Sequence, residues 1–364
     1  MKLYMDVKEL NAGIQSVIKA MPVRTIMPVL DGIYLEASSR GLLLRCSDLM
    51  LQKECFLPAT VEEEGVCVVP GKLFGEYIRK LPDAIVQLSL EGAVLLVQSG
   101  KTQNQTQCIE YEEFPEMRFS GDAFSLTLPV PVCKKMILST AFATSTDDSK
   151  PVLSGAYLEL SGEKLTLVAT DAYQFAMFSW RLPYEAEERS AILQGKALAE
   201  IARMMDEMEK EVTLTFSKTH VKVDLGHSCL VSRLLDGNYI DYKRILPKES
   251  RTRALVSRSG LLEAIDRAQL VAREGNNNIV LSISENLGTV SAQSYVGKAH
   301  EELEVQATGE NIEIAFNPKY CINVLKSLED ENIYMEFNGS INPCVIRQVQ
   351  DETHYYLVVP MRIY

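Results

Sequence analysis

The stretch from Leu30 to Cys55, LDGIYLEASSRGLLLRCSDLMLQKEC, is repeated from Leu153 to Phe178 as LSGAYLELSGEKLTLVATDAYQFAMF. Matching positions lie about 120 residues apart throughout, as an internal repeat requires. The identical pairs are Leu30/Leu153, Gly32/Gly155, Tyr34/Tyr157, Leu35/Leu158, Glu36/Glu159 and Asp48/Asp171. A weaker third copy begins near Asn278 as NIVLSISENLGTVSAQSYVGKAHEEL. One module in three copies is typical of a scaffold whose shape serves its function.

Six amphipathic segments recur at half this interval. They begin near Val7, Gly71, Val130, Gly195, Ser257 and Asn317, about 60 residues apart, with apolar residues at helical spacing. Ser257 and Asn317 are suitable N-caps, and Pro318 suits a first helical position. Between these segments, alternating apolar runs broken by turn residues predict β-hairpins.

These patterns predict an α+β fold of three similar domains, each with two helices and two small antiparallel sheets. The predicted boundaries are 1–121, 122–248 and 249–364. Exposed sheet edges are ready to pair, so domains joined edge to edge would form a curved arc. Two such arcs can close into a ring, of which one chain is half.

Composition narrows the class of protein. The 364 residues are 46% hydrophobic, and no apolar run reaches the roughly 20 residues of a membrane span. The N-terminus lacks a secretory signal, which predicts a cytoplasmic protein with no membrane partner. The eight cysteines include no CxxC pair and are interpreted as small buried hydrophobes, the alternative being a metal or disulfide site. The four histidines have no ligand spacing, so we expect no metal and no cofactor.

The net charge of −12 argues against a wholly basic surface for gripping nucleic acid. Acidic residues cluster in the predicted loops, whereas every predicted helix carries at least two cations. A solvated helix face would explain one such helix, but the recurrence in six favours a cationic concave surface. Such a surface suits sequence-independent, salt-sensitive contact with an encircled duplex.

The chain resembles the β subunit of bacterial DNA polymerase III, the sliding-clamp family, over essentially its full length. The most specific pieces are VATDAYQFA from Val168, LLDGNYIDYKRILPK from Leu234, FNPKYCINVLKSL from Phe316 and YYLVVPMRIY from Tyr355. The resemblance implies a head-to-tail homodimer that encircles double-stranded DNA as a non-catalytic processivity factor. Its implied partners are the DNA polymerase III α subunit, the ATPase clamp-loader complex, and other clamp-binding replication and repair proteins.

The resemblance also implies a hydrophobic cleft between the second and third domains, which receives partner peptides carrying a glutamine and apolar residues. The matching positions are Leu153, Thr170, Ala172, Tyr173, Gln174, Phe175, Ile240, Arg244, Ile245, Leu246, Pro343, Val358, Val359, Pro360, Met361 and Arg362. Val358 to Met361 can equally form a last core strand. For DNA, the matching basic residues are Arg24, Lys72, Lys150 and Lys196.

Three departures from the family pattern bear on partners and assembly. Ala172-Tyr173-Gln174 stands where Gly-His-Arg is common, and Ile240 replaces a proline, which predicts a different peptide preference. The expected dimer edge reads Gln103-Asn104-Gln105-Thr106, against Leu270 and Val271 on the facing helix. With Asn104 and Thr106 at this interface, less apolar area is buried, at about 25 cal/mol per Å², and a weaker ring is expected.

Two alternative functions remain at this point. A clamp paralogue with altered peptide preference and little replicative role would explain the cleft and the polar edge. The second alternative is an enzyme, which would need a catalytic or nucleotide-binding motif. The chain has no GxxxxGK[ST], GxGxxG, HExxH or GxSxG motif. Asp147, Asp148 and Asp171 could be metal carboxylates, yet the copy of Asp171 at Asp48 favours a structural turn.

Overall fold

The computed structural model describes residues 1–82, 84–110, 114–121, 124–147, 149–205, 210–247 and 249–362. The expected boundary residues Asp122 and Lys248, the candidate ligand Asp148 and the last two residues lie outside this description. The chain forms two compact units, Met1–Cys133 with Glu200–Leu234, and Lys134–Ala199 with Leu235–Tyr364.

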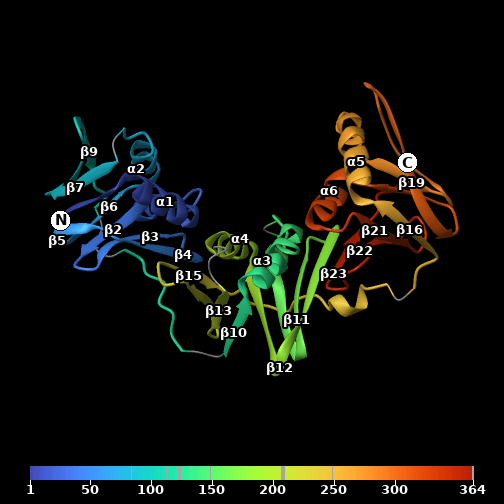
Figure 1. Ribbon diagram of the computed structural model, residues 1–364, viewed down its shortest axis with the longest axis horizontal. Coiled ribbons are helices and arrows are strands. Elements are labelled where there is room, and N and C mark those ends of the chain that lie inside the picture. The colour runs from blue at the N-terminus through green and yellow to red at the C-terminus, as the bar shows by residue number, and fades with distance from the viewer. Residues whose placement is uncertain are drawn as a thin grey trace. The chain divides into compact units, whose positions relative to one another are not determined.

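The first unit contains two antiparallel sheets of order β5-β1-β7-β8-β9 and β10-β13-β14-β15-β4-β3-β2-β6. Their strands are β1 (Lys2–Asp6), β2 (Gly32–Ser38), β3 (Gly41–Ser47), β4 (Leu51–Leu57), β5 (Thr60–Glu63), β6 (Gly65–Pro70), β7 (Ile85–Glu91), β8 (Val94–Ser99), β9 (Thr102–Gln107), β10 (Phe124–Pro129), β13 (Glu211–Phe216), β14 (His220–Asp224) and β15 (Ser228–Arg233). The helices are α1 (Val7–Val17) and α2 (Gly71–Ile78), with 3-10 turns at Ile18–Ala20 and Pro28–Asp31. Helix α1 packs on β3 and β4, and α2 on β2 and β6 (Figure 1).

The second unit is built on one ten-stranded sheet of order β11-β12-β23-β22-β21-β16-β19-β18-β17-β20. Its strands are β11 (Gly155–Thr170), β12 (Gln174–Gln194), β16 (Thr252–Ser257), β17 (Ile279–Ile283), β18 (Leu287–Ser294), β19 (Gly297–Gly309), β20 (Ile312–Phe316), β21 (Asn332–Phe337), β22 (Cys344–Gln348) and β23 (His354–Val358). Helices α5 (Arg258–Ala272) and α6 (Pro318–Ser327) pack against each other (Figure 1). The 3-10 turns are Ala141–Ala143, Pro151–Ser154 and Tyr242–Arg244. Helices α3 (Val130–Leu138) and α4 (Gly195–Met204) each have residues in both units.

All six predicted helices are present, and each follows a strand with at most one residue between them. The predicted caps are confirmed: Ser257 Oγ accepts from the Gly260 amide at 3.3 Å, and Asn317 Oδ1 accepts from the Lys319 amide at 3.0 Å, ahead of Pro318. Helix α1 shows why these segments pack, because Leu10, Ile14 and Val17 share one buried face.

The repeats are joined edge to edge, as expected from the free sheet edges. Strand β4 of the first repeat pairs with β15 of the second, with Cys55 opposite Ser228. Strand β12 of the second repeat pairs with β23 of the third. The small sheets of neighbouring repeats are therefore fused into larger ones, and backbone hydrogen bonds carry each joint.

Candidate functional site

A tight turn between β11 and β12 presents three of the expected cleft residues. Asp171 Oδ1 accepts hydrogen bonds from the amides of Tyr173 and Gln174, both at 2.8 Å. Ala172 adopts a φ of 78°, in the left-handed region that favours glycine. The first repeat has the same turn, where Asp48 accepts from Met50 and Leu51 and Leu49 has a φ of 70°. This repetition supports the structural role expected for Asp171.

The buried amide of Gln174 ties this turn to helix α6. Its Oε1 accepts from Asn323 Nδ2 at 3.2 Å, and its Nε2 donates to Asp171 Oδ2 at 3.0 Å. The neighbouring Tyr173 stacks on Tyr320 with ring centroids 5.8 Å apart. Sequence reasoning missed Tyr320 and Asn323, although both lie three residues apart in the segment FNPKYCINVLKSL. Their spacing on one helix face is the signal that could have found them.

The C-terminal segment runs beside the turn. In the β12–β23 register Gln174 faces Val358 and Phe175 faces Leu357, and the Val359 amide donates to the Tyr173 carbonyl at 2.9 Å. The Met361 amide donates to the Ala315 carbonyl at 2.7 Å. Val358 is buried, Val359, Pro360 and Met361 are half-buried, and Arg362 is exposed. The segment is therefore both a core strand and a partly exposed surface.

An apolar cluster lies under this surface. Phe175 packs with Tyr242 and Leu357, and Leu246 lies against the same cluster. Burial, together with Glu159, raises the pKa of Tyr242, which stays a neutral hydroxyl that donates to Glu159 Oε2 at 2.5 Å. Tyr173 (55% exposed), Ile240 (39%) and Ile245 (43%) leave much of their apolar surface open to solvent.

The remaining cleft candidates have other local surroundings. The half-buried Leu153 lies in the 3-10 turn Pro151–Ser154, where its carbonyl accepts from the Ser145 amide at 2.7 Å. Pro343 lines a small polar cavity of about 170 Å³ together with Val345 and Arg347. Arg244 pairs with Asp241 at 2.8 Å and remains largely exposed. Thr170 is buried, and its hydroxyl donates to the Gln174 carbonyl at 2.7 Å.

The four basic residues assigned to DNA contact are all exposed. Arg24 and Lys72 belong to the first unit, and Lys150 and Lys196 to the second. Arg24 lies in a loop between Pro22 and Pro28, together with the exposed side chains of Val23 and Ile26. Lys72 and Lys196 each occupy the second position of their helices.

The expected dimer residues lie on a sheet edge and a helix surface. Strand β9 is the outer strand of the five-stranded sheet, and on it Thr106 Oγ1 donates to Asn104 Oδ1 at 2.8 Å. On α5, Leu270 is 62% exposed and Val271 is half-buried. Asn104 and Thr106 thus bond to each other, while the outer edge of β9 offers backbone groups.

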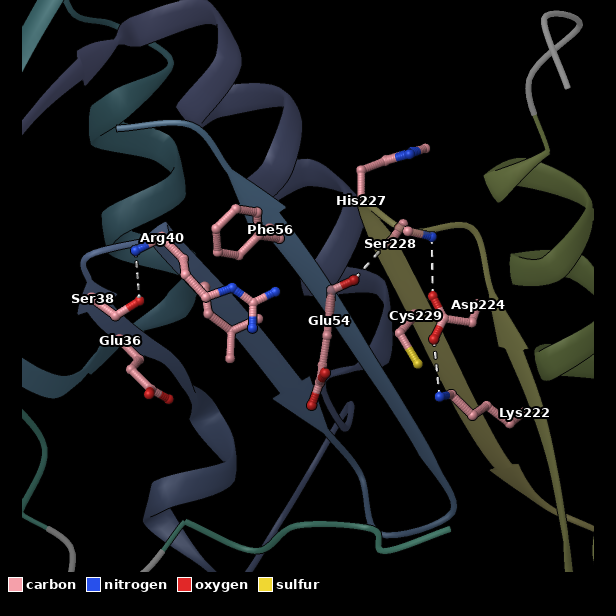
Figure 2. A pocket seen from close by; sticks show the side chains of 12 residues that line it. Glu36, Ser38, Arg40, Glu54, Phe56, Lys222, Asp224, His227, Ser228 and Cys229 are labelled. Carbon is pink, nitrogen blue, oxygen red and sulfur yellow. Dashed lines mark hydrogen bonds and ion pairs between the residues drawn. The ribbon is translucent and has the colours of Figure 1, made fainter. Parts of the chain in front are cut away.

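A cavity of about 300 Å³ on the first unit lies over the joint between β4 and β15 (Figure 2). Arg40 stacks over Phe56 at 5.4 Å, and Lys222 pairs with Asp224 at 2.9 Å. This contact raises the pKa of Lys222 and lowers that of Asp224. Glu54 is held by Arg45 at 2.7 Å, so the paired charges here favour neither a cationic nor an anionic ligand.

The described residues contain neither a candidate metal site nor a membrane-spanning helix. No group of three His, Cys, Asp or Glu side chains there is arranged to hold a metal ion. In the same part of the chain, no helix combines the length and apolar character needed to cross a bilayer.

Comparisons with known proteins agree over the whole chain. Three family models of the DNA polymerase III beta subunit match: the N-terminal domain at residues 1–118, the central domain at 127–241 and the C-terminal domain at 243–362. The beta sliding clamp of Bacillus subtilis is 33% identical, with 100% of both chains covered.

Solved structures give the same result. The B. subtilis sliding clamp has a TM-score of 0.92 at 32% identity, and the Thermotoga maritima DNA polymerase III beta subunit has 0.92 at 30%, each with both chains fully covered. The chain therefore belongs to the family of DNA polymerase III beta subunits, the non-catalytic sliding clamps.

Proposed function

We propose that two copies of this chain close head to tail into a ring around double-stranded DNA and tether the DNA polymerase III α subunit for processive synthesis. The observation that carries the proposal is the edge-to-edge joining of three repeats, which leaves β9 as the outer strand of its sheet. An outer strand can continue the same pairing with a second copy. An ATP-driven clamp loader would open the ring, in the cytoplasm.

The surface around Tyr173 is proposed as the cleft for partner peptides. Its support is the combination of exposed apolar side chains with a buried amide network that fixes the turn. Apolar anchors of a peptide would fill the surface beside Tyr173 and Ile245, and polar groups at its rim would orient the peptide's glutamine. The α subunit, the loader and repair proteins would compete for it.

The test combines solution mass with retention on DNA. A homodimer has twice the chain mass of 40.7 kDa. Protein loaded onto nicked circular DNA by the cognate loader and ATP should stay through gel filtration and be lost when the circle is linearised. Equal retention on both forms would contradict encirclement, and a monomer at micromolar concentration would contradict ring closure by two copies.

A paralogue with little replicative role is the second candidate, favoured by Ala172-Tyr173-Gln174 and by the polar strand β9. Processive synthesis by the cognate polymerase distinguishes the two. Product lengths on a primed circular template should increase when the chain and the loader are added. Unchanged lengths, with a loaded ring demonstrated in the same reaction, would favour the paralogue.

A further inference from the structure

Two cysteines of the first repeat meet where its two sheets approach each other. Cys67 belongs to β6, at the end of the eight-stranded sheet, and Cys108 directly follows β9, the outer strand of the five-stranded sheet. The backbone joins them, because the Ile109 amide donates to the Val68 carbonyl at 2.8 Å. Cys67 is 3% exposed, whereas Cys108 is half-buried and within reach of small solutes.

The side chains of this pair are in contact and differ in character. The Cys67 and Cys108 thiols share a hydrogen bond, and the Leu95 amide also bonds to the Cys108 sulfur. The bond from Cys67 lowers the pKa of Cys108 to about 7, while the same contact and burial raise the pKa of Cys67. The α-amino group of Met1 is the nearby positive charge. A half-buried thiol with a lowered pKa thus lies against a buried thiol with a raised pKa.

Among the other cysteines, Cys321 and Cys344 also interact, but both are buried and burial raises the pKa of each. Burial alone raises the pKa of Cys46 and raises that of Cys133 to about 12, and burial also raises that of Cys229 to about 12. Cys229 is half-buried like Cys108, so it offers similar access with a thiol whose pKa is raised. It is therefore the natural internal control for the reactivity of Cys108.

We propose that Cys67 and Cys108 form a reversible disulfide, with Cys108 as the thiol oxidised first by hydrogen peroxide and Cys67 as the resolving thiol. The Cys108 thiolate attacks one peroxide oxygen, the O–O bond breaks, and the released hydroxide takes up a proton as water. The Cys67 sulfur then attacks the sulfenic acid sulfur, forming the S–S bond and releasing a second water. The two thiols lose two electrons, and the peroxide gains them. The bond would fasten the end of β9 to β6.

The experiment uses the full chain treated with hydrogen peroxide at stoichiometric amounts, followed by alkylation and peptide mapping. We expect a peptide pair linked through Cys67 and Cys108, the loss of two free thiols per chain, and full recovery with dithiothreitol. Cys229→Ser should leave the linkage unchanged, and Cys67→Ser should let dimedone trap the sulfenic acid on Cys108. At pH 7, iodoacetamide should alkylate Cys108 at least about tenfold faster than Cys229.

Peptide mapping of the peroxide-treated wild-type chain tests the proposal by itself, so the test does not depend on whether the variants fold. Oxidation of Cys108 to sulfinic acid without a linked peptide would overturn the proposal. So would alkylation of Cys108 at the rate of Cys229, because the thiolate on which the first step depends would then be missing.

Discussion

The Lys53 ammonium lies 3.2 Å from the Glu200 carboxylate, and both side chains are only 3% exposed. Lys53 comes from β4 of the first repeat and Glu200 from α4 of the second, and Arg203 also pairs with Glu200. A buried carboxylate without a partner costs several kcal/mol, so this ion pair fixes the joint between repeats more than it adds net stability.

We therefore predict that Lys53→Met lowers the free energy of unfolding by about 2 kcal/mol, because the buried Glu200 then keeps only the largely exposed Arg203 as its partner. The double variant Lys53→Met with Glu200→Leu should recover most of the loss, because neither buried charge of the pair then remains. Urea unfolding of the wild type, both single variants and the double variant gives the coupling energy. Additive losses in the double variant would mean that the two side chains act independently.

The second prediction concerns the left-handed turn residue Ala172. Ala172→Gly should raise the free energy of unfolding by about 0.5 kcal/mol, because the relief of the strained φ exceeds the extra freedom of glycine in the unfolded chain. Ala176→Gly is the matched control, since Ala176 lies in the regular strand β12 and should lose about 1 kcal/mol. Equal losses at both positions would show that the turn carries no strain.

Sequence patterns located the six helices well, because each has a strong 3.6-residue period and begins directly after a strand. The caps at Ser257 and Asn317 followed from local chemistry that acts within three residues. The order of the strands in the fused sheets could not be predicted from the sequence. Strand order depends on pairing between distant segments, such as Cys55 with Ser228, which no local period encodes.

The candidate site likewise has some features that the sequence predicts and others that it does not. The turn role of Asp171 could be inferred from its repeat at Asp48, and the structure has the same two hydrogen bonds in both copies. The contacts of Gln174 with Asn323 and of Tyr173 with Tyr320 join segments about 150 positions apart, and tertiary packing alone brings them together. The contact between Cys67 and Cys108 has the same origin.

The third prediction tests the peptide surface. Tyr173→Ala should weaken binding of a fluorescent peptide carrying the α subunit's clamp-binding segment by at least about tenfold, because an exposed aromatic anchor is removed. The control is Tyr295→Ala, since Tyr295 is 83% exposed in the corresponding turn of the third repeat, where its hydroxyl donates to Glu274 Oε2 at 3.0 Å. Fluorescence anisotropy measures both. Equal affinities for the two variants would remove Tyr173 from the cleft.

The fourth prediction addresses DNA. Arg24→Ala combined with Lys196→Ala should shorten retention on nicked circular DNA and flatten its salt dependence, because fewer phosphate contacts release fewer counterions. Retention is measured at several salt concentrations after loading. Arg181→Ala, an exposed cation of β12 paired with Glu163, serves as the control. If the double variant keeps the wild-type salt slope, Arg24 and Lys196 do not contact the duplex.

The fifth prediction follows from the buried His354. Its Nε2 lies 3.0 Å from Ser139 Oγ, and its Nδ1 lies 3.1 Å from Gln348 Nε2, a group that can only donate. Thr353 Oγ1 at 2.9 Å and Asp351 Oδ2 at 3.3 Å also lie against Nδ1, and burial favours the neutral ring, in which Nδ1 accepts from Gln348. Burial lowers the pKa of His354 below its ordinary value of 6.5, a shift that Lys135 increases and that Asp351 and Glu329 oppose.

Because the folded state disfavours the protonated ring, protonation of His354 favours unfolding. The stability that the neutral ring preserves is therefore fully present above pH 6.5 and is lost as the pH falls below that value. The free energy of unfolding should decrease there with a slope of at most about 1.4 kcal/mol per pH unit, which is the limit for one proton. Urea unfolding between pH 7.5 and about 5 measures this slope in the wild type and in His354→Gln, which should remove it. His300→Gln is the control, because His300 is an exposed residue of β19. An identical slope in His354→Gln would assign the pH dependence to other groups and leave His354 with a packing role alone.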